Sequence, residues 1–355
     1  MLKQQLAMQQ FGQPNIISSI KIGEIIESTY KIERLLAVGQ QSTIFQARSL
    51  RSTDANYFAL KLEYINLGQA ILQNEVVVLQ RIGGREHFAQ IYKYGLHKQY
   101  KFLAIDLLGP NVSDILRQTQ IRKLSLSSVV KIGIQGLEAL STLHKAGFTH
   151  GQINSENIVI GYQKEQSGNL YLIDFAQSQQ INSRKKSAKT INILQLVQND
   201  LHSLLRMVMS LYLSVNDDQV NNMNGQEAQF NEYDEILHEI VQFDAEISKI
   251  DFESIGDYSQ LQFLLRMMAE SNGANLSNPF EWQFEINQQA INQMEQQKRI
   301  LKERQNQLSL LVNKFKIPNN QSGPKEDQKK AIQFALQALP QRPDQITLDL
   351  ILLEV

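Results

Sequence analysis

The spacing of apolar residues changes at the segment Leu107-Leu108-Gly109-Pro110. Before this segment, short apolar stretches with strand-like alternation predict β-strands over 30–34, 42–48, 57–62, 90–95 and 100–107. One stretch there has helical spacing and predicts a helix over 70–81. After the segment, longer stretches predict helices over 112–118, 127–146, 200–213, 235–243 and 258–269, and two short strands over 158–160 and 170–173. The chain is therefore expected to form an α+β structure with a strand-rich lobe, which carries one helix, and a helical lobe.

The composition narrows the class of protein. The 355 residues include 35 Lys and Arg against 36 Asp and Glu, so the formal net charge is −1. A protein that binds nucleic acid or a membrane surface with much of its length carries a basic excess, so we expect neither partner. The absence of Cys excludes disulfides, cysteine nucleophiles and thiolate metal sites. No apolar run reaches the roughly 18 residues of a membrane span. We expect a cytoplasmic protein, with the cytoskeleton or another large assembly as a further expectation.

The composition also divides the chain. Residues 1–27 read as a polar N-terminal tail, and 28–283 as one domain made of 28–108 and 109–283. Residues 284–355 read as a helical C-terminal extension, with Met294, Leu301, Leu308 and Phe315 at seven-residue spacing. One apolar column suits packing on the chain's own domain, packing on a protein partner, or a homodimeric coiled coil. We expect protein partners to bind this extension and the helical lobe.

Several short motifs, in one order, resemble a known family. They are Gly83-Gly84 after the first predicted helix, Leu107-Leu108-Gly109-Pro110-Asn111 at the change of pattern, Asp257-Tyr258-Ser259, and Phe280-Glu281-Trp282. Together with a strand Lys, a helical Glu and a later Asp-Phe, they resemble the protein kinases and, among these, the casein kinase 1 family. The resemblance covers about residues 28–283 and implies a two-lobed protein-kinase-like fold.

The resemblance implies where a nucleotide would bind. Lys61 matches the strand lysine that holds the phosphates, and Glu75 matches the helical glutamate that pairs with it. Gly39 is the one glycine kept from a glycine-rich phosphate loop. The hinge residues Ile105, Asp106 and Leu107 fall where the family binds the nucleotide.

The same resemblance implies a metal site. Asn157 and Asp174 match the family's two magnesium ligands. Phe175 follows Asp174, and with His150 and Leu79 it matches members of a hydrophobic stack between the lobes.

The catalytic loop departs from the family pattern. Gln152 stands where kinases have the Asp that accepts the proton of the attacking hydroxyl, and a neutral amide cannot act as that base. Asn154 replaces the Lys that neutralises the transferred phosphate, and Gly151 replaces an Arg. Only 25 residues separate Asp174 from Asp200, which is predicted to open the central helix of the helical lobe. The substrate-binding segment between them is therefore expected to be largely absent, leaving a short basic loop at 183–189.

These losses favour one reading of the function over two others. The favoured reading is a casein-kinase-1-like pseudokinase, a non-catalytic scaffold or docking subunit in which ATP and magnesium bind weakly or not at all. The first alternative is a weakly active or atypical ATP-dependent serine/threonine kinase, which the retention of Lys61, Glu75, Asn157 and Asp174 supports. The second is a sensor that binds ATP without turnover and changes its affinity for a partner.

Overall fold

The computed structural model describes residues 20–39, 42–51, 57–65, 71–118, 124–181, 188–213 and 234–284. All of them lie in one compact unit of the chain. Several sequence predictions lie outside the described residues: the tail before residue 20, most of the basic loop at 183–189, and the extension from 285 onward.

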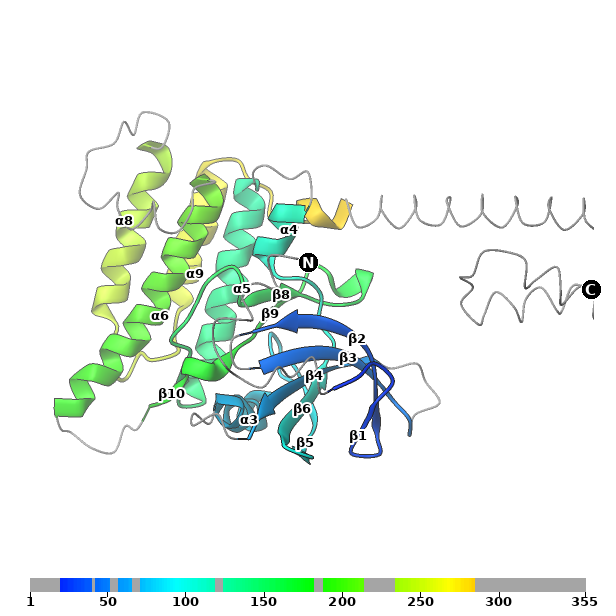
Figure 1. The fold of residues 1–355 in the computed structure, drawn as a ribbon. Coiled ribbons are helices and arrows are strands. Elements are labelled where there is room, and N and C mark those ends of the chain that lie inside the picture. Colours follow the sequence, from blue (N-terminus) through cyan, green and yellow to red (C-terminus); the bar gives the residue numbers. More distant parts are fainter. Residues whose placement is uncertain are drawn as a thin grey trace, which may run out of the picture. The chain divides into compact units, whose positions relative to one another are not determined.

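Six strands form the antiparallel sheet of the N-terminal lobe, in the order β1-β2-β3-β4-β6-β5 (Figure 1). Their bounds are β1 Ile25–Ile26, β2 Tyr30–Val38, β3 Ser42–Ser49, β4 Tyr57–Tyr64, β5 Ile91–His97 and β6 Tyr100–Asp106. The five strands predicted for this lobe are confirmed. β1 was not predicted, and it pairs with β2 while Ile20 and Ile26 are buried, so the sheet begins before residue 28.

One helix, α3 (Ile71–Ile82), packs against this sheet and contacts β5 and β6. Its buried residues Leu72, Val76 and Leu79 follow helical spacing, which explains why the segment forms a helix with one apolar face. Gly83 and Gly84 end the helix as predicted, and Gly84 has a φ of 75°, a left-handed conformation that glycine adopts without strain.

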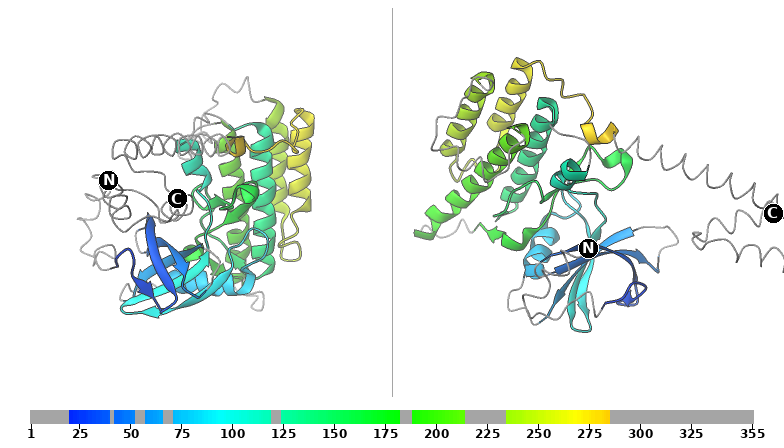
Figure 2. Two further views of the ribbon diagram at one scale, coloured as in Figure 1. Left: turned by 90° about the vertical axis from the view of Figure 1, so that its right-hand side faces the viewer. Right: turned by 45° about the horizontal axis from the view of Figure 1, so that its top comes forward.

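The C-terminal lobe is helical (Figures 1 and 2). Its described α-helices are α4 Val112–Gln118, α5 Leu126–Lys145, α6 Ala188–Leu213, α8 Asp234–Lys249 and α9 Ser259–Ser271. The mostly buried helix α5 contacts both α6 and α9, and α8 contacts α6 and α9. A strand-rich lobe followed by a helical lobe is the two-lobed kinase fold that the sequence predicted.

Two predicted helix starts were wrong. α5 begins at Leu126, one residue before the predicted start, and its N-cap is Ser125, whose hydroxyl accepts the backbone N–H of Ser128 at 3.3 Å. The Ser127 hydroxyl instead donates to the Asn275 carbonyl. The central helix α6 begins at Ala188 rather than at Asp200. Asp200 lies inside this helix, where its side chain binds the catalytic loop from the side.

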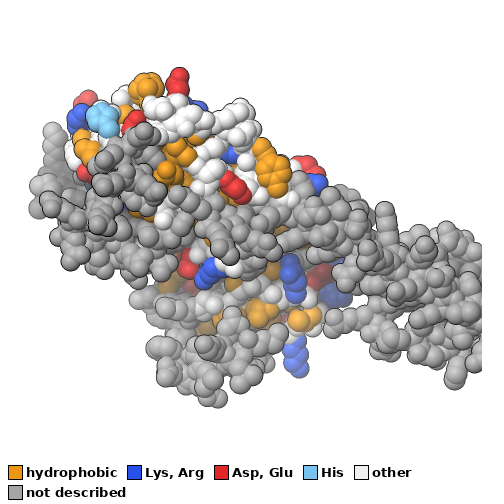
Figure 3. All heavy atoms as spheres, turned by 90° about the horizontal axis from the view of Figure 1, so that it is seen from above, with side chains coloured by type: hydrophobic (Ala, Val, Ile, Leu, Met, Phe, Trp, Pro, Cys, Tyr) orange, Lys and Arg blue, Asp and Glu red, His pale blue; other side chains and the backbone are white. Residues whose placement is uncertain are grey.

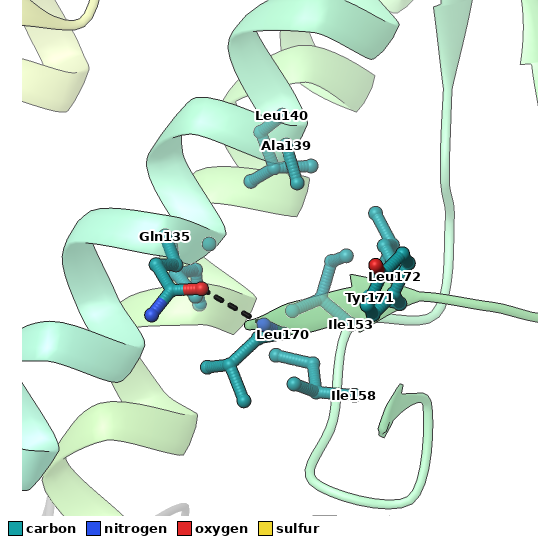
Figure 4. A pocket seen from close by; sticks show the side chains of 10 residues that line it. Gln135, Ala139, Leu140, Ile153, Ile158, Leu170, Tyr171 and Leu172 are labelled. Carbon is teal, nitrogen blue, oxygen red and sulfur yellow. Dashed lines mark hydrogen bonds between the residues drawn. The ribbon is translucent and has the colours of Figure 1, made fainter. Parts of the chain in front are cut away.

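Two small strand pairs place the loops of the site. β8 (Ile158–Ile160) pairs with β9 (Leu170–Leu172), and β7 (Phe148–Thr149) pairs with β10 (Gln179–Gln180). Figure 4 shows a narrow apolar pocket between α5 and the β8–β9 pair. At its edge the amide of Gln135 accepts the backbone N–H of Leu170 at 2.8 Å and donates to the Gly168 carbonyl at 3.0 Å. One side chain of α5 thus holds the strand that leads to Asp174.

Two observations of the described residues concern the expectations about nucleic acid and about membranes. On the face in Figure 3, Lys and Arg side chains lie among Asp and Glu side chains. No helix within the described ranges is long and apolar enough to cross a membrane.

Candidate active site

A buried ion pair joins the lysine that was predicted to hold phosphates to the glutamate that was predicted to pair with it. Lys61 on β4 and Glu75 on α3 are both buried, and the Lys61 Nζ lies 2.6 Å from the Glu75 Oε2. Asp174 Oδ1 lies 3.7 Å from the same Nζ. Burial alone would lower the pKa of Lys61, but the Glu75 and Asp174 carboxylates outweigh it and raise that pKa above its ordinary value. Lys61 is therefore a fixed cation.

Asp174 occupies a special backbone position. Its φ of 67° and ψ of 74° are left-handed, a region that Asp adopts more readily than most residues. The short helix η3 (Phe175–Gln177) follows at once, and the Asn74 amide of α3 donates to the Ala176 carbonyl at 3.3 Å. The Asp174 side chain is 38% exposed, so its carboxylate lies close to Lys61 and is also accessible to solvent.

Asp200 of α6 organises the backbone of the catalytic loop. Its carboxylate accepts the backbone N–H groups of His150 at 2.7 Å and Gly151 at 2.8 Å. The ring of His144 lies 3.0 Å from the same carboxylate. Burial would raise the pKa of Asp200, but these hydrogen bonds outweigh it and hold that pKa below its usual range. Asp200 thus ties the catalytic loop to α6.

His150 connects the loop to Asp174 and to the stack between the lobes. Its Nε2 lies 3.0 Å from the Ile173 carbonyl, and its Nδ1 accepts the Gln152 N–H at 3.2 Å. Its ring meets Phe175 edge to face at 5.2 Å. Leu79 lies in the same apolar cluster, and Phe88, which the sequence did not indicate, lies 6.1 Å from Phe175.

Gly151 has a backbone conformation that other residues avoid. Its φ is 83°, and a Cβ at this position would lie 2.8 Å from the carbonyl oxygen of Gln177. The loop therefore requires glycine here.

The residues at the two altered catalytic positions are held by hydrogen bonds. The Gln177 amide donates to the Gln152 Oε1 at 3.1 Å. The Asn154 Oδ1 accepts the backbone N–H groups of Glu156 and Asn157, each at 3.0 Å, as in an Asx turn. Gln152 is exposed and Asn154 partly exposed, so Gln152 can contact a substrate, while Asn154 chiefly shapes the loop.

The two predicted metal ligands lie on segments that a backbone hydrogen bond joins. The Ile173 N–H donates to the Asn157 carbonyl at 3.0 Å, which places Asn157 beside the strand end that carries Asp174. The Asn157 Nδ2 donates to the Gln152 carbonyl at 2.9 Å, so its amide oxygen is the group that can bind a metal. A carboxylate and an amide oxygen suit magnesium, which takes its remaining ligands from water and phosphate. Among the described residues, no group of three or more His, Asp or Glu could hold a metal.

The predicted hinge residues lie at the end of β6, and their side chains have different surroundings. Ile105 and Leu107 are buried in the apolar cluster that also contains α3. The Asp106 carboxylate accepts the Gln90 N–H at 2.8 Å and the Tyr92 hydroxyl at 2.7 Å. Burial and the Asp106 carboxylate raise the pKa of Tyr92 to about 12. The Asp106 side chain thus braces the hinge against β5.

Gly39 lies at the turn between β2 and β3, and its N–H donates to the Ser42 carbonyl at 2.8 Å. The next two residues lie outside the described part of the chain.

The sequence reasoning missed three residues of the site. His144 supports Asp200, Gln177 holds Gln152, and Glu63 lies buried beneath α3. The spacing of Lys61 and Glu63 on one strand was a usable signal, because alternate strand residues share a face. The partners of His144 and Gln177 are far away in the sequence, so no local pattern marked them.

Comparison with known proteins agrees with this geometry. A family model described as the protein kinase domain matches residues 30–195. A Dictyostelium discoideum protein named a probable serine/threonine-protein kinase is 23% identical over 291 residues, 75% of this chain and 58% of that protein. A Caenorhabditis elegans protein named as a casein kinase I is 28% identical over 156 residues, 43% of this chain and 45% of that protein.

A second C. elegans protein, named as a serine/threonine-protein kinase, is 25% identical over 164 residues, 46% of this chain and 47% of that protein. The chain thus spans about half the length of these curated relatives.

These names contradict the prediction that the chain is not an enzyme. The relatives are named kinases, and the ion pair of Lys61 and Glu75 is intact beside Asp174. The prediction gave too much weight to Gln152, because a missing base slows phosphoryl transfer but leaves positioning and charge neutralisation in place. The two-lobed fold agrees with the match of residues 30–195 to the protein kinase domain.

Proposed function

We propose that this chain is an atypical ATP-dependent serine/threonine protein kinase that transfers phosphate without a carboxylate base. The observation that carries the proposal is the arrangement of Lys61, which lies 2.6 Å from Glu75 and 3.7 Å from Asp174. A buried lysine paired with one carboxylate and close to a second, partly exposed one suits the binding of a magnesium-bound polyphosphate. The names of the relatives support serine and threonine as acceptors.

Each group of the site has a role in this proposal. Lys61 holds the phosphates, and Glu75 fixes the lysine side chain. The Asp174 carboxylate and the Asn157 amide oxygen hold magnesium, which neutralises phosphate charge when it is bound with the nucleotide. The backbone of Ile105–Leu107 is expected to bind the edge of the nucleotide's adenine ring. His150 and Asp200 keep the loop in place through the hydrogen bonds described above.

The transfer step can proceed without a base. The oxygen of a substrate hydroxyl attacks the γ-phosphorus, and the bond from that phosphorus to the oxygen of the leaving ADP breaks. The hydroxyl proton passes to solvent or to an oxygen of the transferred group. Gln152 can accept a hydrogen bond from the hydroxyl through Oε1 and so orient it. A general base contributes about 10²–10⁴-fold, so we expect turnover that is slow by that order.

The nucleotide half of the proposal is tested by calorimetric titration with ATP, with and without magnesium. Wild type should bind magnesium-ATP, and Lys61→Ala and Asp174→Ala should each weaken binding at least about tenfold. Lys93→Ala is the matched control, because Lys93 is a lysine of the same sheet whose partner is Glu27. Binding that is equal in wild type and Lys61→Ala would contradict the assignment of the site.

The catalytic half is tested by transfer of radiolabelled phosphate from ATP to a mixture of serine and threonine peptides. Label should appear in phosphoserine or phosphothreonine with wild type and not with Asp174→Ala. Binding of magnesium-ATP without any transfer would contradict the proposed activity.

A further inference from the structure

Glu63 is a buried carboxylate that the proposed reaction does not use. Its residue exposure is 0%, and it lies on β4 two residues after Lys61. A charged group with no access to water is costly unless hydrogen bonds and an opposite charge compensate it. The contacts of Glu63 therefore indicate what it does.

Both carboxylate oxygens of Glu63 have partners on other elements. Oε2 accepts the backbone N–H of Leu72, in the first turn of α3, at 2.7 Å. Oε1 lies 3.1 Å from the Nζ of Lys101, which is directly opposite Glu63 on β6. One side chain thus connects β4, β6 and the beginning of α3.

The first turn of α3 needs such a group. The first N–H groups of a helix have no partner within the helix, and the N-terminus carries a partial positive charge. The first turn of α3 contains no acidic residue of its own. The Glu63 carboxylate supplies both the acceptor and the negative charge from the neighbouring strand.

Lys61 and Glu63 hold the same helix at two points. They lie on the same face of β4, because alternate residues of a strand point to the same side. Lys61 binds Glu75 and Glu63 binds the Leu72 N–H, so the two contacts lie three helical residues apart, about 4.5 Å along the axis. A helix held at one point can pivot, whereas two contacts from one strand fix its rotation and distance.

We infer that Glu63 is a positioning residue: it holds α3 on β4 so that Glu75 reaches Lys61. Part of its test rests on the proposed nucleotide binding, and part does not. If α3 is held less firmly, Lys61 loses its fixed partner and the site loses phosphate affinity. A purely structural role would lower stability without acting through Lys61.

The first test is a double-mutant cycle on magnesium-ATP affinity. Glu63→Ala should weaken affinity about tenfold in the wild-type background and by less than twofold in the Lys61→Ala background. Glu63→Gln, which keeps an acceptor for the Leu72 N–H, should recover most of the affinity. Glu33→Ala is the matched control, because Glu33 is a partly exposed carboxylate of the same lobe paired with Arg48. An equal loss in both backgrounds would overturn the inference.

The second test needs no nucleotide. Hydrogen exchange measured by mass spectrometry should show faster exchange over residues 71–75 in Glu63→Ala than in wild type. Exchange over α5 should be the same in both proteins, and Glu63→Gln should show a smaller change. Unchanged exchange over 71–75 in Glu63→Ala would overturn the inference. If wild type binds no magnesium-ATP, the proposed function fails, and this measurement alone decides the role of Glu63.

Discussion

Each altered residue of the catalytic loop has a structural role that explains its presence. Gly151 permits a left-handed turn against the Gln177 carbonyl, Asn154 caps the loop backbone, and Gln152 is held by the Gln177 amide. The sequence marked these positions as losses. The structure shows that they form a loop with its own set of hydrogen bonds.

Replacement of Gly151 should destabilise the protein. Gly151→Ala should lower the free energy of unfolding by about 1–3 kcal/mol, because a left-handed conformation and a close backbone contact both oppose a Cβ. Gly168→Ala is the control, since the nearest atom there belongs to the end of the Gln283 side chain at 3.3 Å. Denaturant unfolding of the two variants measures the difference. Equal stability of Gly151→Ala and wild type would contradict the described turn.

His150 should make stability depend on pH. Burial holds the pKa of His150 below its ordinary 6.5, consistent with a neutral ring that accepts a hydrogen bond at Nδ1. Since the unfolded chain takes up the proton first, this residue contributes stability above pH 6.5, and the contribution is lost as pH falls below that value. The loss of stability between pH 7 and 5 should be smaller in His150→Phe than in wild type. His238→Phe, at an exposed position of α8, should keep the wild-type slope.

Gln152→Asp tests the part that the missing base plays. If the loop geometry supports transfer, a carboxylate at this position should raise turnover by roughly 10²-fold or more. It should also introduce a fall in rate as pH drops towards about 4, where an aspartate takes up a proton. Gln195→Asp, at an exposed position of α6, is the control for added charge. Unchanged turnover in Gln152→Asp would show that the missing base does not limit the rate.

At the scale of elements, periodicity predicted the existence of the strands and helices and missed some of their ends. The burial of α3 and α5 follows the spacing of their apolar residues, which a sequence displays directly. The start of α5, just after its N-cap Ser125, depends on which of several serines accepts a backbone N–H. The early start of α6 and the two-residue strands depend on contacts between distant segments, which spacing does not record.

The β8–β9 pair depends on one polar contact from α5. Gln135→Leu would leave the Leu170 N–H without the partner shown in Figure 4, and it would also leave the Gly168 carbonyl without its amide donor. We expect a loss of about 1–3 kcal/mol in the free energy of unfolding, because these groups would be left unsatisfied in a largely buried setting. Gln198→Leu, which removes weaker contacts at 3.3 Å and 3.5 Å, should cost less. A neutral Gln135→Leu would show that the contact contributes little.

At the scale of the whole molecule, the sequence predicted the two lobes and the pair of Lys61 and Glu75. It also proposed Asp106 as a nucleotide-binding residue, and the structure shows its carboxylate bound to Gln90 and Tyr92. The support of Asp200 by His144 could not be predicted, because 56 residues separate them in the sequence. The prediction that the chain is not an enzyme was wrong because it weighed the missing catalytic side chains and left out the arrangement of Lys61, Glu75 and Asp174.

The central claim is that Lys61, Glu75 and Asp174 form a site that transfers phosphate despite Gln152. The most direct measurement is single-turnover transfer of radiolabelled phosphate from magnesium-ATP to a serine/threonine peptide mixture, in wild type, Lys61→Ala and Asp174→Ala. We predict slow transfer by wild type and none by either variant. The account would be contradicted by transfer that persists in both variants, or by its absence in a wild-type protein that binds magnesium-ATP.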